Sequence, residues 1–145
     1  MKQYDPKMHS TEHILNQTMV RMFNCGRSFS AHIEKKKSKV DYHFERDLSE
    51  DEIAKIQIRV NEVINSGAEV REEFYNKDEA IKKFNLSKLP KDAGDKIRII
   101  HIGDYDSCPC IGNHVQNTNE IGEFIIISTN YENGVLRIRF KLKSK

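Results

Sequence analysis

Apolar residues recur at helical spacing in two stretches of the chain. In the first stretch, which follows Pro6, the apolar positions are Ile14, Leu15, Met19, Met22 and Phe23. This spacing predicts a helix of about four turns that ends before Gly26. The second stretch begins with Ser49 and Glu52 at capping-box spacing and ends at Gly67, and its apolar face consists of Ile53, Ile56, Val60, Val63 and Ile64. Two substantial amphipathic helices are therefore expected.

Short alternating segments predict strands outside these helices. Residues 29–33 and 39–46 flank a lysine-rich run and suit a β-hairpin with a basic tip. Near the end of the chain, residues 122–129 and 135–143 suit a second hairpin, because the Asn133-Gly134 pair between them favours a tight turn. Each of these two hairpins is thus expected to consist of antiparallel strands.

The middle of the chain adds strands at 68–75 and 96–103, with a short helix capped by Asn76 and a polar loop over 89–95 between them. Strands scattered between two main helices indicate an α+β fold, in which the helices pack on a largely antiparallel sheet. The 145 residues contain no repeat or linker composition, so one domain over 1–145 is expected.

Composition narrows the class of protein. The chain has 24 Lys and Arg against 22 Asp and Glu, which argues against a DNA-coating protein but allows RNA to bind a local basic patch. No apolar run approaches the roughly 20 residues that a membrane span needs, and the first residues lack the apolar segment of a secretory signal. A cytoplasmic protein without a membrane partner is expected, with its three cysteines reduced.

Two pairs of residues have the spacing of metal ligands. His9 and His13 are four positions apart, which places both imidazoles on one helical face. Cys110 and His114 form a C-x-x-x-H turn at the end of a predicted strand. Together they offer the nitrogen and sulfur donors that Zn²⁺ prefers in tetrahedral sites, so the sequence predicts a zinc site.

Cys108 is an alternative thiol for this site, since it lies two residues before Cys110. We prefer Cys110 as the ligand because the loop from Cys110 to His114 is compact and contains Gly112, whereas the span from Cys108 includes a proline. No other histidine has a ligand-like partner, and Cys25 is interpreted as a core thiol.

With H-x-x-x-H on the first helix and C-x-x-x-H after a late strand, the sequence resembles the editing domain shared by alanyl- and threonyl-tRNA synthetases, and the free-standing alanyl-tRNA editing proteins. The matching pieces follow the family's order along nearly the whole chain: HSTEHIL (9–15), VDYHF (40–44), CIGNHV (110–115), NEIGEF (119–124) and GVLRIRF (134–140).

The resemblance implies a trans-editing hydrolase that removes serine or glycine from the acceptor end of mischarged tRNA(Ala). It implies that Zn²⁺ is held by His9, His13, Cys110 and His114, and that the hairpin from Phe29 to Phe44 forms a wall of the aminoacyl pocket. Two features depart from the family. The usual turn reads C-G-G-T-H, where this chain has CIGNH, and the residues nearest to the family's pocket positions are Ser28, Ser30 and His32.

Glu12 is the candidate catalytic residue, because it lies beside the histidine pair. Zinc with four protein ligands has no open position at which to activate water, and Glu12 could activate the water instead. Its alternative interpretation is a first-turn acid that favours the helix dipole. For RNA, the candidates are the outward face of the last strand, Arg137, Arg139 and Lys141, and the hairpin tip, Lys35, Lys36 and Lys37.

Two other functions fit parts of the sequence. HSTEH also satisfies the H-x-x-E-H pattern of a metallopeptidase, with Glu12 as base, but this leaves Cys110 and His114 unexplained. A non-catalytic module, in which zinc only stabilises the fold and the basic strand binds RNA or a synthetase, explains both ligand pairs.

Overall fold

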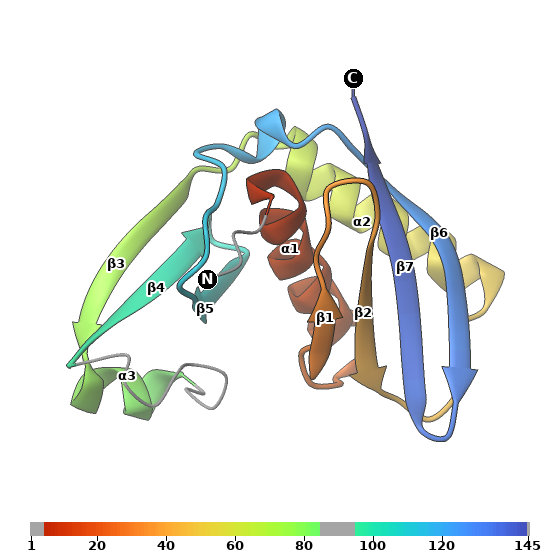
Figure 1. The fold of residues 1–145 in the computed structure, drawn as a ribbon, viewed down its shortest axis with the longest axis horizontal. Helices are drawn as coiled ribbons and strands as arrows, with labels where there is room; N and C mark the ends of the chain where they lie inside the picture. Colours follow the sequence, from red (N-terminus) through yellow and green to blue (C-terminus); the bar gives the residue numbers. More distant parts are fainter. Residues whose placement is uncertain (1–4, 85–94, 145) are drawn as a thin grey trace.

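The computed structural model describes residues 5–84 and 95–144 and has the expected α+β architecture. Helix α1 (Pro6–Phe23) lies between two antiparallel sheets, as Figure 1 shows. One sheet has the strand order β1-β2-β7-β6 and the other the order β3-β4-β5. The fold class predicted from the sequence is confirmed, and the strands are divided between two sheets.

The strands are β1 (Ser30–His32), β2 (Ser38–His43), β3 (Val70–Asn76), β4 (Lys96–Ile102), β5 (Asp106–Pro109), β6 (Glu123–Glu132) and β7 (Val135–Lys143). The remaining helices are α2 (Glu50–Asn65), the short α3 (Lys77–Lys83) and a 3-10 turn, η1 (Thr118–Glu120).

Helix α1 begins where the side chain of Asp5 accepts a hydrogen bond from the backbone N–H of Met8, with Pro6 in the first turn. It ends at Asn24, which adopts the left-handed conformation at φ 55°, two residues earlier than the predicted stop at Gly26. Because α1 lies between the sheets and against α2, polar as well as apolar side chains of this helix are buried.

Helix α2 begins with the predicted capping box, in which the side chains of Ser49 and Glu52 each accept a hydrogen bond from the other's backbone N–H. Its buried face is Ile56, Val60 and Ile64. The main core lies between α1, α2 and the four-stranded sheet, and its largest fully buried side chains include Met8, Ile14, Leu15, Met19, Tyr42, Phe124 and Phe140.

Both predicted hairpins are present. In the second, Asn133 and Gly134 have φ of 50° and 81°, the positive values that a two-residue hairpin turn with the strands' own twist requires. In β7, Leu136, Ile138 and Phe140 are buried, so the intervening basic residues face away from the core.

The three-stranded sheet differs from the prediction next to the proposed ligands. The sequence predicted that the strand at 96–103 leads directly into the ligand turn, but a turn at Gly103 reverses the chain into β5, where Cys108 lies opposite Ile100. The ligand loop therefore follows β5 rather than β4. The predicted polar loop 89–95 lies, except for Asp95, outside the described residues. Within the described part of the chain, no helix is long and apolar enough to cross a membrane.

Candidate metal centre

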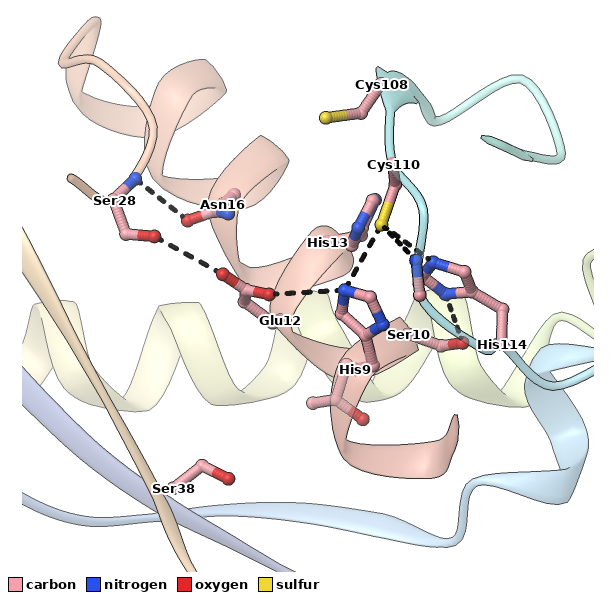
Figure 2. Close-up of polar contacts among 12 residues, drawn as sticks. His9, Ser10, Glu12, His13, Asn16, Ser28, Ser38, Cys108, Cys110 and His114 are labelled. Atoms are coloured by element: carbon pink, nitrogen blue, oxygen red, sulfur yellow. Dashed lines mark hydrogen bonds and ion pairs between the residues drawn. The ribbon is translucent and has the colours of Figure 1, made fainter. Parts of the chain in front are cut away.

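Four donor side chains converge beside α1. His9 and His13 come from the first turns of this helix, and Cys110 and His114 from the loop after β5. One possible ligand atom of each residue lies within 4.8 Å of the corresponding atoms of the other three. Figure 2 shows the two helical imidazoles facing the cysteine sulfur and the third imidazole. The structure thus brings together the two sequence motifs, which are about a hundred residues apart.

The histidine rings present one nitrogen to the sulfur and the other to the protein. Nε2 of His9 lies 3.3 Å and Nε2 of His114 lies 3.5 Å from Sγ of Cys110. Nδ1 of His9 donates a hydrogen bond to the backbone carbonyl of Asn113 at 3.1 Å, which leaves the Nε2 lone pair for a ligand. Nδ1 of His114 contacts Oγ of Ser10 at 3.0 Å. Contacts of this kind orient metal-ligating histidines in proteins.

His13 has a buried carboxylate behind it. Its Nδ1 lies 3.5 Å from Oδ2 of Asp106 and forms no hydrogen bond within the described part of the chain. Asp106 is fixed by Arg27, through hydrogen bonds of 2.7 and 3.2 Å, and by the side-chain amide of Gln17 at 2.9 Å. A carboxylate behind an imidazole is the arrangement that raises the basicity of a metal ligand, so this donor set fits a metal ion.

The ligand loop is held against the helix by close packing. An added Cβ on Gly112 would lie 2.2 Å from Cε1 of His9, so any other side chain would force the imidazole or the loop to shift. Gly112 is not among the described residues with positive φ, so it is needed for this close approach and not for a left-handed turn. Arg98 of β4 donates to the carbonyl oxygens of Cys110 and Gly112 at 3.3 and 2.7 Å and fixes the outer side of the loop.

The cluster stabilises a thiolate. Burial raises the pKa of Cys110, but hydrogen bonds from His114, His13 and His9 outweigh it and bring the pKa to about 3. Burial lowers the pKa of His13, yet the close contacts with the charged Asp106 carboxylate and Cys110 thiolate raise it to about 9. Burial and its charged neighbours lower the pKa of His114 to about 4. The sulfur is therefore already in the form that binds metal.

A cleft of about 430 Å³ opens beside the cluster, lined by His9, Glu12, His13, Asn16, Arg27, Phe29, Ser30, Ala31, Ile33, Cys108, Pro109, Cys110, Ile111 and Gly112. Glu12 is the only carboxylate among these lining residues. Its Oε1 lies 3.8 Å from Nε2 of His9, and its Oε2 accepts a long hydrogen bond of 3.5 Å from Oγ of Ser28.

The three predicted pocket residues have different positions. Ser30 lines the cleft, and Ser28 is buried behind it, in contact with Glu12. His32 is exposed and does not line the cleft; it borders a separate cavity with Lys39 and Arg139. The reason is the register of the hairpin, which places His32 opposite Lys39 near the tip.

Cys108 lines the cleft but does not belong to the four-donor cluster. Burial raises the pKa of this thiol to about 11, so it remains protonated at neutral pH. The geometry thus separates the two cysteines in the way that the loop spacing indicated.

Sequence reasoning missed Asn16, Arg27 and Asp106. Asn16 has a recognisable signal, because it follows His13 by three positions and so shares its helical face. Its Oδ1 accepts hydrogen bonds from the backbone of Ser28 and the hydroxyl of Tyr42. Arg27 and Asp106 have no local signal, since they meet only through the tertiary fold.

The predicted RNA-binding residues lie away from the cleft. Lys35, Lys36 and Lys37 are exposed at the tip of the first hairpin, and Lys141 is exposed on β7. Arg137 is already paired with Asp41 of β2, at 2.8 and 3.0 Å, so its charge is matched within the protein. The side chain of Arg139 forms no ion pair or hydrogen bond among the described residues.

Residues 97–139 match the family described as the threonyl and alanyl tRNA synthetase second additional domain. An alanine–tRNA ligase from Fervidobacterium nodosum is 33% identical over 121 residues, which cover 83% of this chain and 14% of that protein. An alanine–tRNA ligase from Aeropyrum pernix is 33% identical over 140 residues, covering 91% of this chain and 15% of that protein.

A Saccharomyces cerevisiae protein named "Putative alanyl-tRNA editing protein alaX" is 32% identical over 136 residues, covering 84% of this chain and 30% of that protein. The chain spans less than a third of the length of each of these three relatives. The resemblance found in the sequence is confirmed: residues 97–139 match the second additional domain of threonyl and alanyl tRNA synthetases, and most of the chain is similar to part of these alanine–tRNA ligases.

Proposed function

We propose that this chain hydrolyses the ester bond of mischarged tRNA(Ala), with seryl- and glycyl-tRNA as substrates, at a zinc-containing site in the cytoplasm. The observation that carries the proposal is the four-donor cluster beside a cleft with a single carboxylate. The relationship to alanine–tRNA ligases and to a protein named for alanyl-tRNA editing supports the choice of substrate.

The donor set favours zinc. Three imidazoles and one thiolate are the ligands that Zn²⁺ binds in four-coordinate sites, and His9, His13, Cys110 and His114 would hold it. Bound zinc supplies Lewis acidity that polarises nearby oxygen atoms. Because four protein ligands complete a tetrahedral shell, the proton transfers are assigned to residues of the cleft.

Glu12 is the proposed general base. Its carboxylate takes a proton from the water that attacks the ester carbonyl carbon, and the hydroxyl of Ser28 holds it at the cleft wall. The bond between this carbon and the ribose oxygen then breaks, and Glu12 returns the proton to that oxygen. An aminoacyl ester is already reactive, so positioning the water and the carbonyl contributes most of the acceleration.

The cleft suits a small aminoacyl group. Its volume of about 430 Å³ lies at the lower end of the roughly 300–1,000 Å³ typical of small-molecule pockets. The polar groups of Ser30 and Asn16 at its wall are proposed to contact the amino acid, whose α-ammonium and carbonyl need hydrogen-bond partners.

The metallopeptidase alternative fits the structure poorly. An H-x-x-E-H peptidase completes its zinc shell with a distant carboxylate, whereas here a thiolate and a third imidazole face the histidine pair. The non-catalytic module remains the alternative to test, because it shares the same four donors.

A deacylation panel tests the proposed function. Ser-tRNA(Ala), Gly-tRNA(Ala), Ala-tRNA(Ala) and Ser-tRNA(Thr) would be incubated with zinc-loaded wild type and with Glu12→Gln, which keeps the size of the side chain. We expect wild type to release serine and glycine from tRNA(Ala), and Glu12→Gln to be slower by about 10²- to 10⁴-fold, the usual contribution of a general base.

If wild type binds tRNA but releases no amino acid, the non-catalytic module is correct. If Glu12→Gln retains full activity, Glu12 is not the general base; it is not a first-turn acid either, since it lies in the second turn of α1. Release of free amino acids from peptides in place of tRNA would favour the peptidase.

A further inference from the structure

Three basic side chains form a row across three neighbouring strands of the four-stranded sheet. His32 of β1 lies opposite Lys39 of β2, and Lys39 lies opposite Arg139 of β7. The flanking residues Val40 and Ile138 are buried, so the row is on the face of the sheet that points away from the core. Figure 1 shows β1, β2 and β7 side by side, with α2 behind them. We name His32, Lys39 and Arg139 the basic row.

The basic row borders a cavity of about 300 Å³ at the tip of the first hairpin, together with Glu34, Lys37 and Ser38. Lys37, Lys39 and Arg139 bring three positive charges to this cavity, against the one negative charge of Glu34. Its lining therefore carries a net positive charge of two, before any charge on His32 is counted.

The neighbouring row of the same sheet has paired charges. There, Asp41 of β2 lies opposite Arg137 of β7 and accepts two hydrogen bonds from it. In the basic row, by contrast, neither Lys39 nor Arg139 forms an ion pair or a hydrogen bond with its side chain among residues 5–84 and 95–144. Like charges directly opposite one another destabilise a sheet, so the row has a cost that an anionic ligand would offset.

The shape of the row favours an extended anion. Strands are about 4.8 Å apart, so the three side chains span about 10 Å, which is wider than one phosphate group. The hairpin tip is also fixed, because buried Ser38 donates to the carbonyl of Glu34 and accepts from its N–H, both at 3.0 Å. A row of fixed cations suits the repeating charges of a phosphodiester backbone and reads no base sequence.

The row lies close to the cleft along β1. Ser30 and His32 are two positions apart on this strand, about 7 Å from each other. Ser30 lines the cleft, whereas His32 borders the cavity of the basic row. The cleft and the row are therefore neighbours along one strand.

We propose that His32, Lys39 and Arg139 bind the sugar-phosphate backbone of the tRNA whose 3′ end enters the cleft. The inference rests on the proposed function, since it takes the aminoacylated end as the occupant of the cleft. It assigns His32 to backbone binding in place of the aminoacyl pocket, and adds Lys39 to the RNA contacts.

The test is the double variant Lys39→Gln/Arg139→Gln with an uncharged tRNA(Ala) transcript, whose affinity is measured by fluorescence anisotropy from low to moderate salt. Each lost phosphate contact lowers the slope of log K against log salt by about 1, so we expect a slope smaller by about 2 and a binding loss of at least tenfold at low salt. In the deacylation assay the KM for tRNA rises, while kcat stays at the wild-type value.

The matched control is Lys55→Gln/Arg59→Gln, which removes the same charge from α2, on the other side of the sheet. Equal losses in both double variants would overturn the proposal, since they would report only net charge. Wild-type affinity and slope in the first variant would also overturn it, and so would binding of inorganic phosphate at the row without any effect on the tRNA slope.

These outcomes are separate from those of the proposed function. Binding that depends on the row, in a protein that deacylates nothing, supports the row and refutes the hydrolase. Deacylation by a double variant whose KM is unchanged supports the hydrolase and refutes the row.

Discussion

The candidate metal centre and the basic row, which both lie next to the first hairpin, differ in how their charges are matched. In the metal centre, the outward nitrogens of His9 and His114 contact Asn113 and Ser10, and Asp106 is held by Arg27. In the basic row, neither Lys39 nor Arg139 forms an ion pair or a side-chain hydrogen bond among the described residues, and Lys39 acts on Asp41 only through its charge. Buried groups with fixed partners set geometry, whereas exposed groups without partners remain available to a charged ligand. Substitutions should therefore act on metal affinity in the first site and only weakly on stability in the second.

The largest effect is expected from loss of a ligand. His114→Ala removes a donor that faces Cys110 at 3.5 Å, and the zinc affinity should fall by more than about 100-fold, beyond the range of substitutions outside the ligand shell. Competition with a chromogenic chelator measures it. The control is His43→Ala, which removes an exposed imidazole stacked on Phe29 and should keep wild-type affinity. Equal affinities in the two variants would contradict the assigned cluster.

Disturbing the close packing of the ligand loop should lower zinc affinity almost as much. Gly112→Ala places a methyl group 2.2 Å from Cε1 of His9, so the loop or the imidazole must shift. We expect zinc affinity to fall by about 100-fold, with the secondary structure retained by circular dichroism. Gly26→Ala is the control, since nothing lies within 4 Å of its added Cβ. Normal zinc binding in Gly112→Ala would show that the loop is not held against the helix.

An intermediate effect on zinc affinity is expected from a residue that faces a ligand but does not itself bind the metal. Asp106→Asn keeps the shape of the side chain but removes the charge that faces His13 at 3.5 Å, and should lower zinc affinity by about tenfold. The exposed Asp104→Asn is the matched control and should bind zinc like wild type. Unchanged affinity in Asp106→Asn would mean that the carboxylate serves only Arg27.

The smallest effect distinguishes two arginines on one strand. Arg137→Gln breaks the pair with Asp41 and should lower the unfolding free energy by about 0.5 kcal/mol at neutral pH, whereas Arg139→Gln should not lower it, because the substitution removes the repulsion from Lys39. Urea unfolding measures both. If Arg139→Gln lowers the unfolding free energy as much as Arg137→Gln does, Arg139 has a stabilising partner within the protein.

This difference should depend on pH. The hydrogen bonds from Arg137 lower the pKa of Asp41, so the stability that they contribute is present above the ordinary aspartate pKa of about 3.9 and is lost as the pH falls through the lowered value. The two variants should converge in stability under acid conditions. A gap that widens with falling pH would contradict the pairing.

Local signals were sufficient for much of the fold. Helix α2 begins at Ser49 because its capping box is complete within four residues. The second hairpin turns at Asn133 and Gly134 because both tolerate positive φ. Strand β5 could not be predicted in this way, since four residues that include Pro109 carry no period of their own and form a strand by pairing with β4.

The parts of the candidate site that could be predicted are the ligand pairs that lie close together in the sequence. Spacing alone places His9 and His13 on one face, and the compact loop indicated Cys110. The role of Gly112 was different from the predicted one, because the contact that excludes a side chain comes from His9, far away in the sequence. Arg27 and Asp106 likewise meet only after folding.

The same limit applies to the hairpin. His32 was grouped with Ser28 and Ser30 through the family resemblance, but the structure places His32 outside the cleft and buries Ser28 behind Ser30. Arg137 belongs to a strand face of one charge sign, but the neighbouring strand supplies Asp41. Cross-strand partners cannot be inferred from one strand alone.

The most direct test of the central claim is the zinc content and X-ray absorption spectrum of purified wild type and Cys110→Ala. Four side chains on one ion predict one zinc per wild-type chain, with three nitrogen ligands at about 2.0–2.1 Å and one sulfur at about 2.3 Å. In Cys110→Ala the sulfur shell should be absent and the zinc largely lost. A wild-type spectrum without sulfur, or an unchanged spectrum in the variant, would contradict the account.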